Sequence, residues 1–446
     1  MTKLFGTDGM RAAAGEFPLD YGSVYTLGGA LIRLLKAQGY TPQILIGRDT
    51  RESGVWLEKA LFQGIRGEGG EPISAGVIPT SAISYLTRDY SISAGVVISA
   101  SHNPYQDNGI KIFTSLGMKI SEQWESILED AIRDARVDVD PAEIPIDPAP
   151  SFRSVYVDFL KSRFTPGHSQ RCLKVVIDCS NGASSAFASE ILKDLGFETQ
   201  AIGCSPNGRN INLGCGSLHP EILACRVKES GADMGIAYDG DADRALWVDE
   251  TGRILNGDHT LYVLSEHMQD KGRLSRDTVV ATIMSNMGLE KALKARGLDL
   301  YRSRVGDKYV LEDMLKLGSN LGGEQSGHTI LLDDCPTGDG MLTSIKMLEA
   351  MVASGATLSE LVSGYREFPQ VLQNVRVSRK EELSLFPEIT NAMDRVLDEL
   401  GDVGRLNVRY SGTESVARIM VEGPDQDEIE KHAQSIAAAI AQHLGE

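Results

Sequence analysis

Short apolar runs recur along the chain, each followed by a polar turn and then by a helical pattern. Three of them are Gly95–Ser99, Lys174–Asp178 and Thr278–Thr282. Runs of this length bounded by turn residues are typical of buried strands, and strand, loop and helix in that order predict α/β domains. Because the runs are spaced about 80 and 105 residues apart, we interpret them as an internal repeat of three similar domains, each with a polar loop at a strand's C-terminal end, where open α/β sheets bind ligands.

The last part of the chain has a different pattern. It predicts strands over Arg405–Arg409 and Val416–Val421, followed by a helix that Asp425 and Glu428 begin. Apolar residues of that helix recur at steps of four, three and four, at Ile429, Ala433, Ile436 and Ile440. We therefore expect a smaller α+β domain at this end of the chain.

Boundaries between the domains are predicted from turn-rich segments. Residues 137–152 are rich in proline and acidic residues and are expected to form a solvated linker, whereas Asp249–Gly252 and Phe368-Pro369 mark two further turns. A chain of 446 residues is too long for one hydrophobic core. The predicted domains are 1–150, 151–252, 253–368 and 369–446.

Composition and charge exclude several classes of partner. The chain is 42% hydrophobic and carries a net charge of −18 without a dense basic tract, so nucleic acid and anionic membrane are poor partners. No apolar run approaches the roughly 20 residues of a membrane span, and the first residues lack a signal peptide's apolar core. The six cysteines form no CxxC pair, so a reduced, cytoplasmic protein is expected.

Three aspartates alternate with small residues directly after an apolar run. Asp239, Asp241 and Asp243 follow Met234–Tyr238, and Arg244 comes next. In an extended loop, alternate side chains point the same way, so three carboxylates would converge on one hard cation. An acidic surface turn is the alternative, but strict alternation after a buried strand favours the metal site.

Ser101 follows the first of the apolar runs and has His102 beside it and Lys111 ten residues later. A serine in such a loop is a candidate nucleophile or phosphoryl carrier. From the residues alone, a turn or cap residue is favoured over a catalyst, because that is the commoner role of serine at such positions. His102 is as plausible a loop-orienting group as a base.

Two further loops carry ligand-binding chemistry. Gly322–His328 places a carboxylate, an amide, a hydroxyl and an imidazole in five consecutive residues, a set suited to sugar hydroxyls and to acid or base catalysis. Arg409–Ser415, with Arg418, offers guanidinium, hydroxyl and backbone donors that suit a phosphate. Each loop is only suggestive by itself.

Together, the four loops resemble the α-D-phosphohexomutase family in order and identity over essentially the whole chain. Other segments match the family's pattern, namely Phe5–Arg11, Asn212 with Cys215–Pro220, Val305–Asp307 and Thr337–Gly340. Three positions depart from it: Tyr410 and Ser415 replace prolines, and Ala242 stands where the glucosamine-phosphate branch usually has glycine. The resemblance implies an α/β fold of three similar domains with mixed sheets plus a smaller C-terminal α+β domain around a central cleft.

The resemblance also assigns roles to individual residues. Ser101 would be the phosphoserine and would bind one Mg²⁺ together with Asp239, Asp241 and Asp243. The residues implied in catalysis are Ser101, His102, Arg11, Lys111, Arg244 and His328, the last as a candidate general acid or base. Those implied in substrate binding are Gly306, Asp307, Glu324 and Ser326 for the sugar, and Arg409, Ser411, Gly412, Thr413 and Arg418 for the phosphate that is not reacting.

The function implied is a mutase that moves a phosphoryl group within a hexose phosphate through a bisphosphorylated sugar, with a hexose bisphosphate as activator. Glu324-Gln325-Ser326 and Cys215–Pro220 favour interconversion of glucosamine 6-phosphate and glucosamine 1-phosphate, which feeds UDP-N-acetylglucosamine synthesis. The alternatives are a mutase for glucose or mannose phosphates, a metal-dependent sugar-phosphate phosphatase and a non-catalytic sugar-phosphate-binding protein. A monomer or homodimer is expected.

Overall fold

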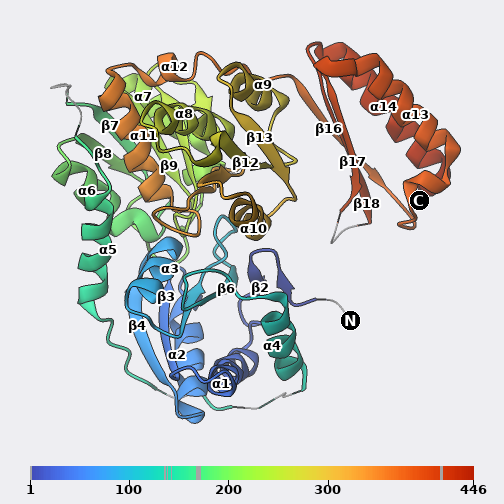
Figure 1. Ribbon diagram of the computed structural model, residues 1–446. Helices are drawn as coiled ribbons and strands as arrows, with labels where there is room; N and C mark the ends of the chain where they lie inside the picture. The colour runs from blue at the N-terminus through green and yellow to red at the C-terminus, as the bar shows by residue number, and fades with distance from the viewer. Residues whose placement is uncertain are drawn as a thin grey trace. The chain divides into compact units, whose positions relative to one another are not determined.

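The computed structural model describes residues 3–134, 137, 139–141, 143–166, 172–411 and 415–445, which divide into two compact units (Figure 1). The first unit consists of Met1–Met284 and Leu298–Ser363, and the second of Ser285–Gly297 and Gly364–Glu446. Three mixed sheets lie in the first unit, and a three-stranded antiparallel sheet lies in the second.

The first sheet has the strand order β1-β2-β6-β5-β3-β4. Its helices cover both faces: α1, α2 and α4 pack on one, and α3 lies against the other, where Gly47 and Gly95 leave room for it. Strand β5 is consequently buried at every position, as expected for a strand covered on both sides. The elements are β1 (Phe5–Gly6), β2 (Gly9–Ala13), α1 (Tyr21–Ala37), β3 (Gln43–Arg48), α2 (Ser53–Gly67), β4 (Glu71–Val77), α3 (Thr80–Asp89), β5 (Ala94–Ile98), β6 (Asp107–Thr114) and α4 (Glu122–Asp134).

The second and third sheets follow the same plan. The second has the order β11-β10-β9-β7-β8 and the third β13-β12-β14-β15. The elements of the second are α5 (Pro150–Ser162), β7 (Lys174–Asp178), α6 (Ala188–Asp194), β8 (Glu198–Ile202), α7 (Pro220–Ser230), β9 (Met234–Tyr238), β10 (Ala245–Asp249) and β11 (Ile254–Leu255). Those of the third are α8 (Gly257–Asp270), β12 (Thr278–Thr282), β13 (Asp299–Ser303), α10 (Asp307–Leu317), β14 (Leu321–Gly323), β15 (Thr329–Leu331), α11 (Gly340–Ser354) and α12 (Leu358–Leu361).

A common strand order makes the three domains an internal repeat. Strands β4-β3-β5-β6, β8-β7-β9-β10 and β13-β12-β14-β15 are each three parallel strands with an antiparallel fourth. The predicted α/β fold with mixed sheets is therefore confirmed. The alignment of the repeat was wrong in one respect. β7 and β12 are the first strands of their repeats, whereas β5 is the third strand of its repeat and β3 is the first. A buried parallel strand has the same apolar pattern wherever it stands in the sheet, so the pattern could not distinguish them.

The segment expected to be a solvated linker is partly buried. Ile144 and Ile146 pack against the hydrophobic core of the first sheet. The backbone N–H of Ala149 donates to the carbonyl oxygen of Ser74 at 3.0 Å, and α5 begins at the next residue. Isoleucines between the prolines therefore anchor this stretch to the first domain, while Glu143, Pro145, Asp147 and Pro148 are exposed.

The second unit is a small α+β domain, as predicted. Its sheet has the order β16-β18-β17, and β17 and β18 each extend one residue beyond the expected strands. The Asp425 carboxylate accepts from the N–H of Glu428 at 3.0 Å and caps α14. The elements are α9 (Met287–Ala295), β16 (Gln370–Arg376), α13 (Pro387–Leu400), β17 (Arg405–Tyr410), β18 (Val416–Glu422) and α14 (Gln426–Leu444).

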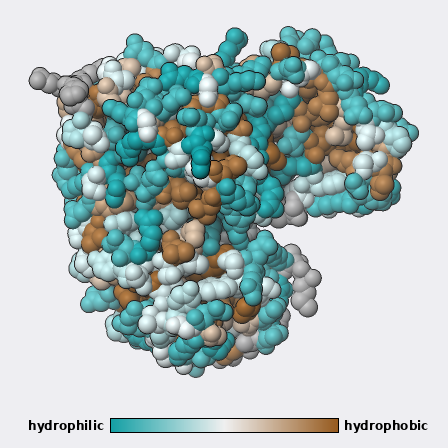
Figure 2. Space-filling model, in the orientation of Figure 1, coloured by the Kyte–Doolittle hydropathy of each residue, from teal (hydrophilic) through white to brown (hydrophobic). Residues whose placement is uncertain are grey.

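Hydrophobic and hydrophilic residues are mixed on the face that Figure 2 shows. Among the helices of the described residues, none is both long enough and apolar enough to cross a membrane. On the face seen in Figure 2, hydrophobic residues form small groups among hydrophilic ones. The six cysteines are all free thiols, three of them buried and three exposed.

Candidate active site

Three loops meet in the first unit because they occupy equivalent places in the repeat. Each connects the third strand of its repeat to the antiparallel fourth strand. The loop between β5 and β6 carries Ser101, the loop between β9 and β10 carries the three aspartates, and the loop between β14 and β15 carries Glu324 and His328. Ligand sites of open α/β sheets form where strands end in this way.

Ser101 is fully buried and has a left-handed backbone with φ of 53°. For a residue other than glycine, this conformation costs about 1–3 kcal/mol and persists only when its surroundings hold it. The side chain of Ser101 donates to Oδ2 of Asp239 at 2.6 Å and lies 3.3 Å from Nδ1 of His102. The fold thus fixes the serine hydroxyl against the first aspartate of the triplet.

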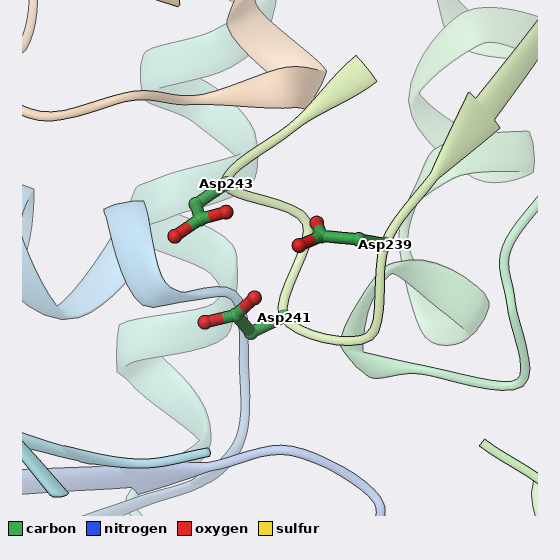
Figure 3. A group of neighbouring side chains, drawn as sticks. All are labelled: Asp239, Asp241 and Asp243. Carbon is green, nitrogen blue, oxygen red and sulfur yellow. The ribbon is translucent and has the colours of Figure 1, made fainter. Parts of the chain in front are cut away.

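The triplet converges, although its loop is a turn and not an extended segment. Ala242 has a φ of 56°, and its N–H donates to the carbonyl oxygen of Asp239 at 3.1 Å. Figure 3 shows the three carboxylates of Asp239, Asp241 and Asp243 turned toward a shared space, and one oxygen of each lies within 4.8 Å of the others. The expected convergence is correct, but a tight turn produces it where an alternating extended loop was predicted.

The chemistry of this cluster fits a hard divalent cation. All three aspartates are buried, and Oδ1 of Asp241 and Oδ1 of Asp243 accept no hydrogen bond from any residue that the structure describes. Burial and the two neighbouring carboxylates raise the pKa of Asp239 well above its usual range. Buried carboxylate oxygens without a hydrogen bond are costly, and an all-oxygen set of this kind suits Mg²⁺ or Ca²⁺.

Cationic side chains surround the triplet. Nζ of Lys111 lies 2.9 Å from Asp241, 2.8 Å from Asp243 and 3.2 Å from Asp8. Burial opposes its charge, but these carboxylates outweigh burial and raise the pKa of Lys111 above its usual range. Nε of Arg244 lies 3.8 Å from Oδ1 of Asp243. Lys111 and Arg244 therefore place positive charge beside the acidic cluster, as binding of an anionic group in an acidic protein requires.

Arg11 approaches the same loop from β2. Its guanidinium pairs with Asp8 and donates to Oδ1 of Asn103 at 3.3 Å. Lys119, which the sequence analysis missed, bridges Oδ1 of Asp8 at 2.6 Å and Asp307 at 2.7 Å. No local pattern marks Lys119, because its role depends on two partners that are more than 100 residues away in the chain.

The two candidate histidines have opposite electrostatic environments. Burial, with the nearby Arg244 and Arg11, lowers the pKa of His102 to about 4, so the imidazole is neutral at pH 7. His328 is also buried, yet Asp243 and Asp307 raise its pKa above the usual value. Its Nδ1 lies 3.8 Å from Asp243 and its Nε2 3.5 Å from Asp307.

A backbone contact fixes the orientation of the His328 ring. Nε2 accepts from the N–H of Gly338 at 2.9 Å, so in the neutral ring the proton lies on Nδ1, which faces Asp243. A Cβ at position 338 would lie 2.5 Å from the ring. Glycine is therefore required for the Thr337–Gly340 segment to pass this close to the histidine.

The predicted sugar-binding residues lie in the third domain. Oε1 of Glu324 accepts from the N–H of Gly306 at 3.0 Å, which joins the Gly306-Asp307 turn to the Glu324 loop. Ser326 is exposed, and the side-chain amide of Gln325 lies 3.4 Å from Asp258. The loop thus presents the carboxylate of Glu324 and the exposed hydroxyl of Ser326 next to His328, which suits recognition of a hydroxylated ligand.

In the second unit, two arginines lie opposite each other on adjacent antiparallel strands. Arg409 on β17 is the register partner of Arg418 on β18, and burial together with the charge of Arg418 lowers the pKa of Arg409. The N–H of Ser411 donates to the carbonyl oxygen of Val416 at 2.8 Å. Adjacent guanidinium groups favour a bound anion. Two further predicted phosphate-binding residues, Gly412 and Thr413, lie outside the described residues.

A buried serine held against an acidic cluster and bordered by lysine and arginine defines an enzyme of the phosphoryl-transfer class. Four family models for phosphoglucomutase/phosphomannomutase match in order: alpha/beta/alpha domain I over residues 2–137, domain II over 154–252, domain III over 256–368, and the C-terminal domain over 372–439. This chain belongs to the phosphoglucomutase/phosphomannomutase family.

Curated relatives agree with that assignment, and solved structures share the fold. The chain is 45% identical to the phosphoglucosamine mutase of Koribacter versatilis, over 99% of this chain and 97% of the relative, and 44% identical to that of Syntrophobacter fumaroxidans over the full length of both. A family protein from Burkholderia thailandensis has a TM-score of 0.81 at 23% identity and covers 99% of this chain and 97% of its own. An Aspergillus fumigatus N-acetylphosphoglucosamine mutase, solved with GlcNAc-6P and magnesium, has a TM-score of 0.69 at 18% identity, with 98% and 95% covered.

Proposed function

We propose that this chain interconverts glucosamine 6-phosphate and glucosamine 1-phosphate through a phosphorylated Ser101 and a bisphosphorylated sugar. The observation that carries the proposal is the buried Ser101 hydroxyl, 2.6 Å from Asp239 within the acidic triplet, in a chain 44–45% identical to curated phosphoglucosamine mutases. The product class would feed synthesis of amino-sugar nucleotides such as UDP-N-acetylglucosamine.

In the proposed reaction, phosphorylated Ser101 donates its phosphoryl group to the free hydroxyl of the sugar phosphate. The sugar hydroxyl loses its proton as the new P–O bond forms, and the serine oxygen leaves with the help of the groups that hold it. His328 is the candidate general base or acid, because its ring lies in the loop that follows Glu324 and is oriented by Gly338. The bisphosphorylated sugar then turns end for end and returns its other phosphoryl group to Ser101.

The transferred phosphoryl group would be held by positive charge. Lys111 and Arg244 border the triplet, and Arg11 lies at the Ser101 loop. Donors placed where charge develops are the main catalytic contribution in phosphoryl transfer. His102, whose pKa of about 4 leaves it neutral, would orient the serine hydroxyl without adding charge.

Asp239, Asp241 and Asp243 would hold one Mg²⁺ together with the phosphate on Ser101. When bound, the ion would neutralise negative charge on the phosphoryl oxygens. Among the described residues, Oδ1 of Asp241 and Oδ1 of Asp243 accept no hydrogen bond, which supports this assignment. A hexose bisphosphate would act as activator by phosphorylating Ser101 when the enzyme has lost its phosphate.

Candidate contacts with the substrate are described for each unit by itself. Glu324 would accept hydrogen bonds from sugar hydroxyls and pair with a protonated 2-amino group, while Ser326 and the Gly306-Asp307 turn would contact the sugar. The phosphate that is not reacting would bind at the arginine pair of the C-terminal sheet, with residues of the same loop: Arg409, Arg418, Ser411, Gly412 and Thr413. The proposed domains are 1–150, 151–252, 253–368 and 369–446, and each carries one of the four loops.

The test compares sugars and a single substitution. With Mg²⁺ and a hexose bisphosphate, kcat/KM for glucosamine 6-phosphate should exceed that for glucose or mannose 6-phosphate by roughly 10- to 150-fold, the value of one charge-assisted contact. Intact mass should show one phosphate on the active enzyme and none on Ser101→Ala. Equal or higher kcat/KM for glucose or mannose would assign the chain to the other sugars. Full activity of Ser101→Ala would remove the carrier role.

A further inference from the structure

A buried arginine binds the backbone of the loop that carries Ser101. Arg51, in the loop between β3 and α2, has no exposed surface. Its Nη2 donates to the carbonyl oxygens of Ser101 at 3.0 Å and Asn103 at 2.8 Å, and its Nη1 donates to those of Pro104 and, at 3.1 Å, Asp107. One guanidinium therefore holds four carbonyl groups of the segment from Ser101 to Asp107.

An asparagine from the second domain binds two of the same carbonyl groups. Nδ2 of Asn212 donates to the carbonyl oxygens of Ser101 at 2.9 Å and Asn103 at 3.0 Å. Asn212 is 8% exposed, and its own N–H donates to the carbonyl oxygen of Ser180 at 2.9 Å. Each of the two carbonyl groups thus accepts one bond from each domain, which uses both of its lone pairs.

The other side of the loop is held as well. Oδ2 of Asp49 accepts from Nε of Arg51 at 2.8 Å and from Oγ of Ser99 at 2.7 Å. The Ser99 hydroxyl in turn accepts from the N–H of Ser101 at 2.9 Å. The peptide groups before and after Ser101 are therefore both fixed by buried side chains, which accounts for the persistence of its left-handed backbone.

The metal-binding loop packs directly on this arrangement. A Cβ added at Gly240, between Asp239 and Asp241, would lie 2.5 Å from the carbonyl oxygen of Ser101 and 3.0 Å from Nδ2 of Asn212. The position of the serine relative to the aspartates therefore depends on where Asn212 holds the serine carbonyl.

We propose that Asn212, together with Arg51, is a positioning residue that fixes Ser101 against the acidic triplet by holding the carbonyl oxygens of Ser101 and Asn103. Neither side chain is placed in the phosphoryl or sugar site, and both act through the backbone of the serine loop. Asn212 adds a link between the domain that carries the serine and the domain that carries the aspartates. The inference rests on the proposed role of Ser101 as the phosphoryl carrier.

The test is Asn212→Asp, which keeps the size and shape of the side chain but turns an acceptor toward two carbonyl oxygens. Because small displacements of reacting groups cost up to about 100-fold in rate, kcat should fall by roughly 10- to 100-fold while KM for the sugar phosphate changes less than about threefold. Asn212→Ala should lose about as much. Mg²⁺ affinity, measured by calorimetry, should stay within about threefold of the wild type, because the triplet is intact.

Asn320→Asp is the matched control. Asn320 is 4% exposed, and its Nδ2 donates to the carbonyl oxygen of Arg273 at 2.9 Å and to Asp333 at 2.7 Å in the third domain. The control should lower the melting temperature as the Asn212 variant does but keep kcat, with all assays run well below each melting temperature.

Wild-type kcat in Asn212→Asp, or an equal loss in Asn320→Asp, would overturn the proposal. If Asn212→Asp does not fold, Arg51→Lys is tested in its place. Lysine keeps the positive charge beside Asp49 but lacks the planar guanidinium that binds several carbonyl groups at once. An unchanged kcat in Arg51→Lys would also overturn the proposal. An inactive wild type would instead refute the proposed function, so the two failures are distinguishable.

Discussion

Lys111 and a bound metal ion should compete for the same carboxylates. Its ammonium lies 2.9 Å from Asp241 and 2.8 Å from Asp243, two of the three aspartates that would ligate the ion. A hydrogen bond to a charged group contributes about 1.5–3 kcal/mol. If metal entry weakens one such bond, Lys111→Met should bind Mg²⁺ about tenfold more tightly, since 1.4 kcal/mol is tenfold in Kd.

The same substitution should destabilise the protein without metal. Removing one partner of a buried charge cluster costs about 3–5 kcal/mol, so the melting temperature in chelator should fall. Saturating Mg²⁺ should recover more stability in the variant than in the wild type, because a ligand stabilises by an amount that grows as its Kd falls. Turnover should nevertheless fall by about 100-fold or more, because a donor to the phosphoryl group is lost.

The assay is calorimetric titration of chelator-stripped, unphosphorylated enzyme with MgCl₂, followed by thermal unfolding with and without the ion. Lys346→Met is the matched control, because Lys346 is a largely buried lysine that pairs with Glu349 at 3.0 Å in α11. It should lose stability and keep the wild-type Kd for Mg²⁺. A Kd in Lys111→Met equal to or weaker than the wild-type value would refute the reasoning.

Three other perturbations test separate parts of the structure. Gly240→Ala would place a Cβ 2.5 Å from the Ser101 carbonyl oxygen and should lower kcat about 100-fold in steady-state assays. Burial opposes the charge of Glu349, but bonds from His267 and Lys346 hold its pKa at about 2, below 4.5. The stability that this carboxylate contributes is therefore present above about pH 4.5 and lost as the pH falls toward 2. In urea unfolding, Glu349→Gln should lower the free energy of unfolding by about 2 kcal/mol at pH 7 and should lose less stability than the wild type between about pH 4.5 and pH 2. Ellman's reagent should modify the exposed thiols of Cys172, Cys204 and Cys225 in the native protein and all six thiols after unfolding. The other three, Cys179, Cys215 and Cys335, are buried, and burial raises their pKa to about 11 or 12.

The sequence by itself determined the local elements and the chemistry that each loop carries. Strands β7, β9 and β12 have the bounds that their apolar runs predict, and the cap at Asp425 begins α14 as expected. Such features depend on neighbours a few residues apart, so a local pattern contains them. The convergence of Asp239, Asp241 and Asp243 belongs to the same class, because five consecutive residues bring the carboxylates together.

Only the tertiary structure decided which loops meet and what holds them there. The Ser101 hydroxyl faces Asp239, 138 residues away in the chain; Lys119 joins Asp8 to Asp307; and Arg51 and Asn212 share the carbonyl oxygens of the serine loop. The repeated strand order places the three loops at equivalent strand ends, and this order is a property of sheet pairing that no short segment encodes. Buried polar groups then find partners across domain boundaries because an unpaired group would be costly there, and those partners can be identified only once the chain is folded.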